Sequence, residues 1–233
     1  MVPLDEDSGT LWEEGRVGEL KKKSAKATKK SAAKKKKAAS PQIETLRQKS
    51  SGKIEVISST LAYDGPLFKV FTDYVREPGG TEQRRDVVRH GGSVVILAID
   101  DSGSKKDPLI VLERQYRHAA NEYLWEIPAG KMDPGEERLA AAKRELLEET
   151  GYKAKKWTKL VRYFASPGFL GEWMQVFLAE GLVAGDAQPE EDEHIELFLV
   201  PLSEVLRMID AGKIADGKTL IAVQLYARTR GRK

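Results

Sequence analysis

The chain has 233 residues, of which 40% are apolar and 32% are charged, proportions that are ordinary for a globular protein. No run approaches the roughly 18 apolar residues of a membrane-spanning helix, so we expect no membrane partner. The chain has no cysteine, which excludes disulfides, thiolate metal sites and a cysteine nucleophile and is typical of a cytoplasmic protein.

The net charge of +3 is unevenly distributed. The first 50 residues contain 13 Lys and Arg against 7 Asp and Glu, a surplus of six, which leaves −3 for the rest. Ten lysines lie between Lys21 and Lys37. With little apolar surface to offset the entropy of ordering, residues 1–48 are predicted to be a disordered basic tail. Such a tail is either a solubilising extension or an electrostatic anchor for nucleic acid or an anionic surface.

From Lys53 onward the sequence predicts strands. Residues 53–60 and 67–77 are rich in β-branched and aromatic residues, with the turn-forming sequences YDGP and EPGG around them. Ser93–Ile99 is a continuous apolar run of strand length and is predicted to be a buried strand. After a polar loop, Leu109–Arg117 is predicted to be the returning strand.

The C-terminal half also mixes strands and helices. Strands are predicted near 157–165, near 173–180 and at IELFLVP, followed by helices at Ser203–Ala211 and Lys218–Thr229. The order has no regular strand–helix–strand alternation. A mixed α/β sandwich is therefore favoured over a doubly wound sheet.

Between these strands lies GKMDPGEERLAAAKRELLEETGY, whose end places three glutamates within five residues. DPGEE combines a turn with acids that suit a helix N-terminus, and a helix is predicted from about Glu136 to Thr150. Gly151 is well placed to end it in a left-handed conformation. The side chains of Leu139, Ala142 and Leu146 are predicted to form its buried stripe.

Glu145 and Glu149 are four residues apart and therefore lie on one helix face, with Glu148 beside them. Like charges at this spacing are destabilising unless a cation bridges them. Mg²⁺ prefers carboxylate oxygens and keeps several waters for substrate phosphates. The spacing alone also fits a solvated acidic face, so both interpretations stay open at this point.

The 23 residues from Gly130 to Tyr152 resemble the Nudix box, with every fixed Gly, Glu and Arg position filled and Tyr152 at a position that is usually aliphatic. The resemblance covers roughly residues 50–230. It implies a Nudix-type α/β/α sandwich with a mixed sheet at 91–230, preceded by an N-terminal antiparallel β segment at 52–90. That segment is expected to form the interface of a homodimer.

The resemblance also implies Mg²⁺ as the cofactor, with Mn²⁺ as the alternative. Such ions clamp phosphate oxygens and lower the pKa of a bound water. The implied metal ligands are the Ala129 carbonyl and the carboxylates of Glu145, Glu148 and Glu149. The implied structural positions of the motif are Gly130, Glu136, Arg144, Gly151 and Pro167, of which Glu136 and Arg144 steady the helix.

Pro167, sixteen residues after Gly151, resembles the ADP-ribose pyrophosphatase subgroup, as do ERQYRHAANEYLWEIPAGK upstream and IADGKTLIAVQL downstream. The subgroup implies hydrolysis of the diphosphate bond of ADP-ribose to AMP and ribose 5-phosphate. One alternative keeps the chemistry but acts on another nucleotide sugar or a dinucleotide. An alternative of a different class is a protein that binds nucleic acid or an anionic surface through its tail.

The subgroup further implies substrate contacts at Arg85, Arg114, Arg117, Glu126 and Glu172. Arg117 is favoured for the pyrophosphate because Arg binds phosphate in a bidentate manner, with a surface salt bridge as the alternative. The general base that activates water is expected in the acidic loop, first at Glu191 and second at Glu193.

Aromatic residues and histidines outside the motif receive no catalytic role. Phe68, Phe71 and Tyr74 are predicted to lie in a core or an interface, with stacking on adenine as the alternative. The sequence has three histidines, His90, His118 and His194, which lack the spacing of metal ligands.

Overall fold

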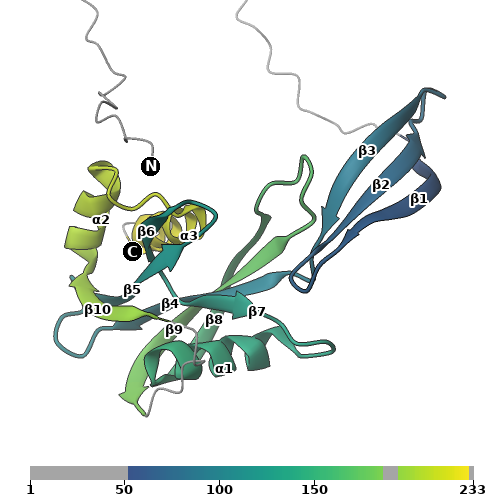
Figure 1. Ribbon diagram of the computed structural model, residues 1–233. Coiled ribbons are helices and arrows are strands. Elements are labelled where there is room, and N and C mark those ends of the chain that lie inside the picture. The colour runs from purple at the N-terminus through teal and green to yellow at the C-terminus, as the bar shows by residue number, and fades with distance from the viewer. Residues whose placement is uncertain (1–51, 186–193, 231–233) are drawn as a thin grey trace, which may run out of the picture. The chain divides into compact units, whose positions relative to one another are not determined.

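Figure 1 shows the computed structural model, which describes residues 52–185 and 194–230. These ranges belong to one unit of the chain, Lys49–Lys233. The predicted basic tail and the predicted base positions Glu191 and Glu193 lie outside the described residues. Among the described helices, none has the length and apolar character that crossing a membrane requires.

The described residues form ten strands and three helices. In chain order they are β1 (Glu55–Asp64), β2 (Lys69–Arg76), β3 (Glu82–Arg89), β4 (Ser93–Asp100), β5 (Leu109–Arg117), β6 (Glu122–Glu126), β7 (Ala129–Lys131), α1 (Arg138–Thr150), β8 (Tyr152–Phe164), β9 (Trp173–Ala184), β10 (Glu196–Pro201), α2 (Leu202–Asp210) and α3 (Gly217–Arg230).

The strands form two sheets. The first is antiparallel with the order β1-β2-β3, which confirms the predicted N-terminal β segment. The second has the order β10-β5-β4-β9-β8, with β6 paired to β5 and β7 paired to β4. Its β4–β9 pair is parallel and its other pairs are antiparallel, so the sheet is mixed as predicted.

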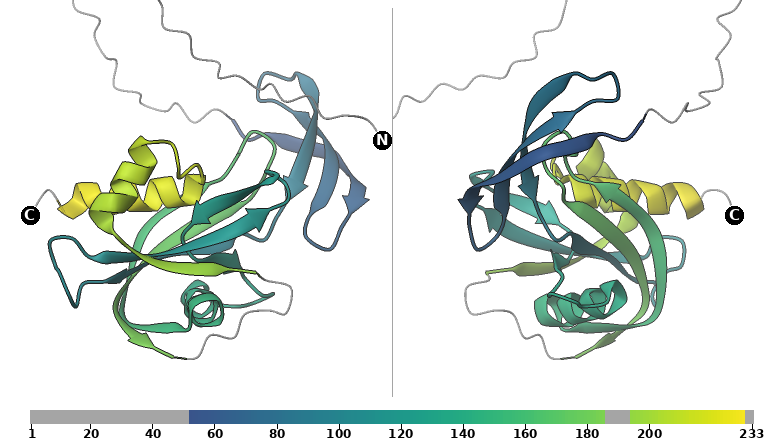
Figure 2. Two further views of the ribbon diagram at one scale, coloured as in Figure 1. Left: turned by 60° about the vertical axis from the view of Figure 1, so that its left-hand side comes forward. Right: turned by 90° about the vertical axis from the view of Figure 1, so that its right-hand side faces the viewer.

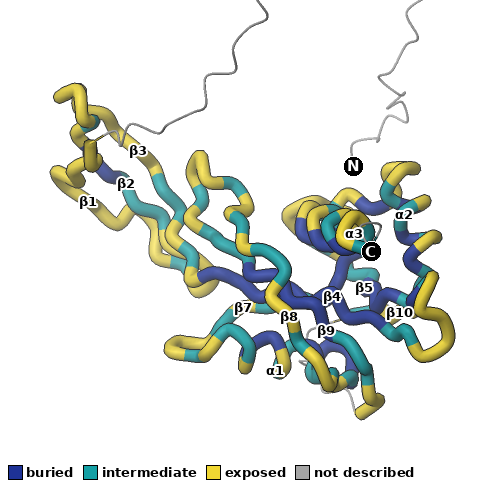
Figure 3. The backbone as a smooth tube through the Cα atoms, turned by 180° about the vertical axis from the view of Figure 1, so that it is seen from behind, coloured by how far each residue is buried: buried dark blue, intermediate teal, exposed yellow. Residues whose placement is uncertain are grey.

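Helices cover both faces of the mixed sheet, with α1 on one face and α2 and α3 on the other (Figures 1 and 2). Strand β4 explains why both faces need a cover. Its side chains alternate between two hydrophobic clusters, and all residues from Val94 to Ile99 are buried (Figure 3). A strand buried on both faces has a continuous apolar sequence rather than an alternating one.

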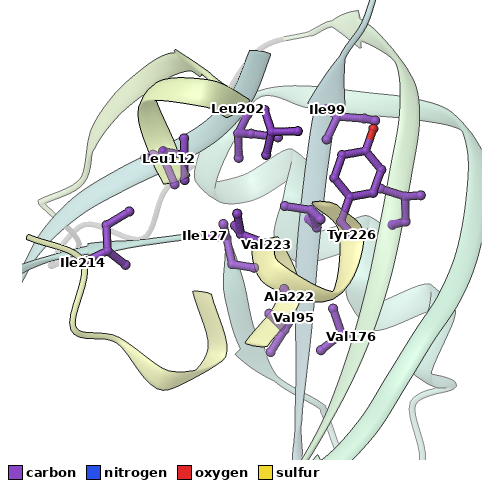
Figure 4. Close-up of a cluster of buried hydrophobic side chains, with 14 of the residues drawn as sticks. Val95, Ile99, Leu112, Ile127, Val176, Leu202, Ile214, Ala222, Val223 and Tyr226 are labelled. Carbon is purple, nitrogen blue, oxygen red and sulfur yellow. The ribbon is translucent and has the colours of Figure 1, made fainter. Parts of the chain in front are cut away.

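The cluster under α2 and α3 contains Ile99, Leu112, Val223 and Tyr226, which come from both strands and helices (Figure 4). The cluster under α1 contains Ala142 and Leu146 as predicted, together with Ala141. Leu139 of the predicted stripe is partly buried and packs against the same cluster. The two clusters hold the sheet between its helices.

Helix α1 begins two residues later than the sequence predicts. Its first turn is capped by Glu137, whose carboxylate accepts a hydrogen bond from the backbone N–H of Leu139 at 2.8 Å. Glu136 stays outside the helix because its carboxylate binds Arg144. The helix ends as predicted at Gly151, which has φ 71° and donates its N–H to the Leu147 carbonyl.

The sequence does not predict β3, β6 or β7 as separate strands, and it predicts β8 and β9 too short. Strand β6 returns along β5 through a turn in which Asn121 has a positive φ of 57°. Strand β8 already begins at Tyr152, and its first residues include exposed lysines. Since β8 is an edge strand of the sheet, charged side chains are tolerated there and hide the strand pattern.

Candidate active site

A cavity of about 890 Å³ brings together residues from both sheets, from α1 and from α3. One wall is acidic and comes from the end of α1. A second wall holds the cations Arg117 and Lys218. A third wall is apolar and contains Phe68 and Phe169. Such a mixture of charged groups and apolar surface suits a ligand that carries both an anionic group and a flat apolar group.

The acidic wall contains Glu145, Glu148 and Glu149, the three glutamates that the sequence singles out. Glu149 is buried, with 7% of its surface exposed, and its Oε2 accepts a hydrogen bond from the backbone N–H of Ala129 at 3.1 Å. Glu145 lies against the backbone of Gly130. Gly130, which begins the motif, and Ala129, which precedes it, therefore lie directly against Glu145 and Glu149 near the end of the motif.

Arg144 organises the acidic wall. Its Nε and Nη2 donate to the two carboxylate oxygens of Glu136 at 3.1 and 3.0 Å, and Nη2 also donates to the Lys131 carbonyl. Hydrogen bonding to Arg144 lowers the pKa of Glu136, and the same contact is the main reason that the pKa of Arg144 is raised. The pair ties the loop before α1 to the second turn of the helix.

The donor chemistry of this wall fits a divalent ion, because Mg²⁺ and Mn²⁺ prefer carboxylate oxygens. Within the described ranges, no three His, Cys, Asp or Glu side chains are arranged to hold an ion. Two of these carboxylates contact Arg144, whose Nη1 lies 3.0 Å from Glu145 Oε1 and 2.9 Å from Glu148 Oε2. The bonds from Arg144 to Glu136 use Nε and Nη2 instead.

The basic wall is built on a buried carboxylate. Glu126 is 2% exposed and accepts hydrogen bonds from Arg117 Nε at 2.9 Å, from Arg117 Nη2 at 2.7 Å and from Lys218 Nζ. Burial raises the pKa of Glu126, but these two cations outweigh it, and the net pKa is lowered. Hydrogen bonding to Glu126 in turn raises the pKa of Arg117. Glu126 and Arg117 are therefore both charged at neutral pH.

The apolar wall joins the two sheets. Phe68 follows the turn between β1 and β2, and Phe169 lies in the loop before β9. Val88 of β3 fixes this loop, because its N–H donates to the Phe169 carbonyl at 2.8 Å and its carbonyl accepts from the Gly171 N–H at 2.9 Å. Phe68 is 38% exposed and lines the cavity, so it does not lie in a core, and its predicted place in an interface or against adenine stays a prediction.

Glu172 lies on the cavity wall with a partner that the sequence did not indicate. Ser93 donates its hydroxyl to Glu172 Oε1 at 2.8 Å. His90 also lines the cavity, and its Nδ1 lies 3.7 Å from the same oxygen and accepts the Gly92 N–H at 3.1 Å. No spacing rule identifies His90, because it meets Glu172 only through the fold.

Six described residues of the predicted site do not line the cavity: Arg85, Arg114, Glu126, Glu136, Gly151 and Pro167. Arg114 lies over the Tyr123 ring at 5.0 Å, and its Nη1 is 3.7 Å from Glu196. Arg85 pairs with Glu77 at 3.1 Å. Pro167 is part of the turn that fixes Phe169, in which the Ser166 carbonyl accepts the backbone N–H groups of Phe169 and Leu170.

Comparison with known proteins matches this chain to the NUDIX domain over residues 89–222. It is 36% identical over 184 residues to the ADP-ribose pyrophosphatase of Bacillus subtilis (strain 168), a match that covers 78% of this chain and 94% of that protein. It is 38% identical over 181 residues to the ADP-ribose pyrophosphatase of Mycobacterium tuberculosis (strain ATCC 25618 / H37Rv), covering 76% and 85%.

Among solved structures, the fold resembles one described as an ADP compounds hydrolase, with a TM-score of 0.68 and 22% identity. The likeness covers 79% of this chain and 98% of that one. Since the NUDIX domain match spans more than half of the chain and includes both the acidic and the basic walls of the cavity, the chain belongs to the Nudix family.

Proposed function

We propose that the chain is a cytoplasmic hydrolase that cleaves the diphosphate bond of ADP-ribose to AMP and ribose 5-phosphate with Mg²⁺, or alternatively Mn²⁺. The observation that carries this proposal is the cavity, in which the box glutamates, two cations and an apolar wall surround one space. Relatives that are named ADP-ribose pyrophosphatases support the choice of substrate.

Glu145, Glu148, Glu149 and the Ala129 carbonyl would hold the metal. When bound, a divalent ion supplies charge neutralisation of the diphosphate and a lowered pKa of a bound water. The ion is needed because a bare acidic wall would repel a diphosphate. In this role the glutamates bind cations and do not contact the substrate themselves.

The other walls would bind the two ends and the centre of the substrate. Arg117 would contact the diphosphate, since a guanidinium is a good donor to phosphate oxygens. Phe68 and Phe169 offer rings to a base, and Glu172 offers carboxylate oxygens to ribose hydroxyls. We propose that Glu191, or as the second choice Glu193, accepts the proton of the attacking water.

A substrate panel tests the proposal. The full-length protein is incubated with Mg²⁺ and, in separate reactions, with ADP-ribose, a GDP-linked sugar and a dinucleotide, and the products are separated by anion-exchange chromatography. We expect the highest kcat/KM for ADP-ribose, with AMP as a product. Absence of AMP with both Mg²⁺ and Mn²⁺ would reject the proposal, and a higher kcat/KM for another substrate would replace ADP-ribose by that compound.

We also propose a homodimer through residues 52–90. Every residue of β1 is exposed in the single chain, and its apolar side chains include Val56, Ile57 and Leu61. An exposed apolar patch on an edge strand favours association with a second copy. Light scattering after size exclusion is expected to give twice the chain mass of 25.9 kDa, and a smaller mass for the double variant Val56→Lys, Leu61→Lys.

A further inference from the structure

The start of α3 is fastened to the end of β6 by two side-chain bonds between consecutive residues. Lys218 Nζ donates to Glu126, and the next residue, Thr219, accepts the Ile127 N–H on its Oγ1 at 3.0 Å. Thr219 is fully buried and Lys218 is 9% exposed. The pairing joins residues that are 92 positions apart in sequence, so it depends on where the fold places α3.

Asp216 completes this arrangement. Its Oδ2 accepts the N–H and the hydroxyl of Thr219 at 3.0 and 2.6 Å, and its Oδ1 lies 3.1 Å from Lys218 Nζ. A carboxylate that accepts the N–H groups of a first turn is stabilised by the helix dipole. Asp216 therefore contacts both the N-terminus of α3 and Lys218. Lys218 in turn is the second cation, after Arg117, that contacts Glu126.

Lys218 restricts how Glu126 can turn. Arg117 donates to Oε1 through Nε and to Oε2 through Nη2, and Lys218 holds Oε2 from a second direction. No hydrogen bond within the described ranges uses Arg117 Nη1. Since Arg117 lines the cavity and uses Nε and Nη2 to bind Glu126, Nη1 is the guanidinium nitrogen that is left for a ligand.

We propose that Lys218 is a positioning residue for the substrate diphosphate, which acts by holding Glu126 and thereby orienting Arg117 toward the cavity. This inference rests on the proposed function. It adds a residue of α3 to the determinants of substrate affinity.

The first experiment compares Lys218→Met and Lys218→Gln with the control Lys213→Met, whose lysine is exposed just before α3. For either Lys218 variant we expect the KM for ADP-ribose to rise by roughly tenfold, with kcat within about threefold of the wild type. Lys218→Arg, which keeps the charge, is expected to restore most of the affinity. Lys213→Met is expected to match the wild type in both constants.

The second experiment does not depend on turnover. Isothermal titration calorimetry measures the binding of inorganic pyrophosphate to the intact chain in the presence of Mg²⁺. Folded Lys218→Met or Lys218→Gln is expected to bind pyrophosphate roughly tenfold more weakly than the wild type, about 1.4 kcal/mol. If the wild type binds pyrophosphate but does not hydrolyse ADP-ribose, the proposed function fails while this comparison still tests Lys218.

A double variant tests whether Lys218 affects pyrophosphate affinity through Arg117. In an Arg117→Met background, the further change Lys218→Met is expected to alter pyrophosphate affinity by less than about twofold, because residues that act through one another are not additive. Unchanged pyrophosphate affinity in the folded single variants would overturn the proposal. So would a full tenfold loss in the Arg117→Met background, which would assign Lys218 a direct contact.

Discussion

The carboxyl group of Glu145 lies so close to the α-carbon of Gly130 that no side chain fits between them. A Cβ atom at Gly130 would lie 2.0 Å from the carboxyl carbon of Glu145 and 2.2 and 2.3 Å from its oxygens. The backbone of Gly130 does not have a positive φ. Glycine is therefore required at position 130 because a side chain there would overlap the Glu145 carboxylate, and not because the backbone needs a conformation that favours glycine.

Gly130→Ala should displace the Glu145 carboxylate without unfolding the chain. Because a shift of about 1 Å at a reacting centre can lower a rate by roughly 10²-fold, we expect a loss of that order in kcat/KM for ADP-ribose. Gly103→Ala is the matched control, since its Cβ meets nothing within 4 Å. Wild-type kinetics in Gly130→Ala would show that the position of Glu145 does not matter for turnover.

Glu149→Gln should remove a metal ligand and preserve the fold. The amide oxygen of glutamine can still accept the Ala129 N–H, but the charge that attracts the ion is lost. We expect turnover to fall by about two orders of magnitude or more, and the Mg²⁺ concentration for half-maximal activity to rise. The comparison is made with Glu122→Gln, an exposed position outside the cavity. Near-normal activity at limiting Mg²⁺ would reject the assignment of Glu149 as a ligand.

The Glu136–Arg144 pair should stabilise the protein in a pH-dependent manner. The folded state lowers the pKa of Glu136 below its ordinary value of 4.5, mainly through hydrogen bonding from Arg144. The contribution is therefore complete above pH 4.5 and is lost as the pH falls through the lowered pKa. Urea midpoints of the wild type and Glu136→Gln should differ at pH 7 and converge below pH 4.5. A difference that is independent of pH would contradict this origin.

Gly151→Ala should destabilise the protein through its backbone conformation. Gly151 ends α1 with φ 71°, a conformation that costs an L-residue roughly 1 kcal/mol more than glycine. We expect a loss of about 1 kcal/mol in the free energy of unfolding, measured with urea. At Gly79, where φ is not positive and a Cβ meets nothing, alanine should be neutral or slightly stabilising.

The local sequence pattern predicted much of the fold and one wall of the cavity. The apolar run at Ser93–Ile99 predicted a buried strand, and β4 is buried because helices cover both faces of its sheet. The end of α1 was predicted at Gly151, since glycine adopts a positive φ at low cost. Glu145, Glu148 and Glu149 line the cavity together because helical periodicity fixes their common face.

Other features were not visible in local pattern. Strand β6 has only five residues, which is too short for a clear sequence pattern. It forms because it pairs with β5. The start of α1 was predicted two residues early because Glu136 suits a first turn by its charge, whereas the fold uses that charge to bind Arg144. A tertiary contact therefore overrode the helix propensity at this position.

The acidic motif, and with it the kind of ligand that its wall can hold, can be predicted from the sequence because local hydrogen bonding sets the spacing of side chains along one helix. The residues that face this wall depend on the fold. Lys218 meets Glu126 across 92 residues, and Phe68 and Phe169 come to one cavity from different sheets. Such contacts follow from how α3 and β3 pack, and packing depends on the shapes of many side chains at once.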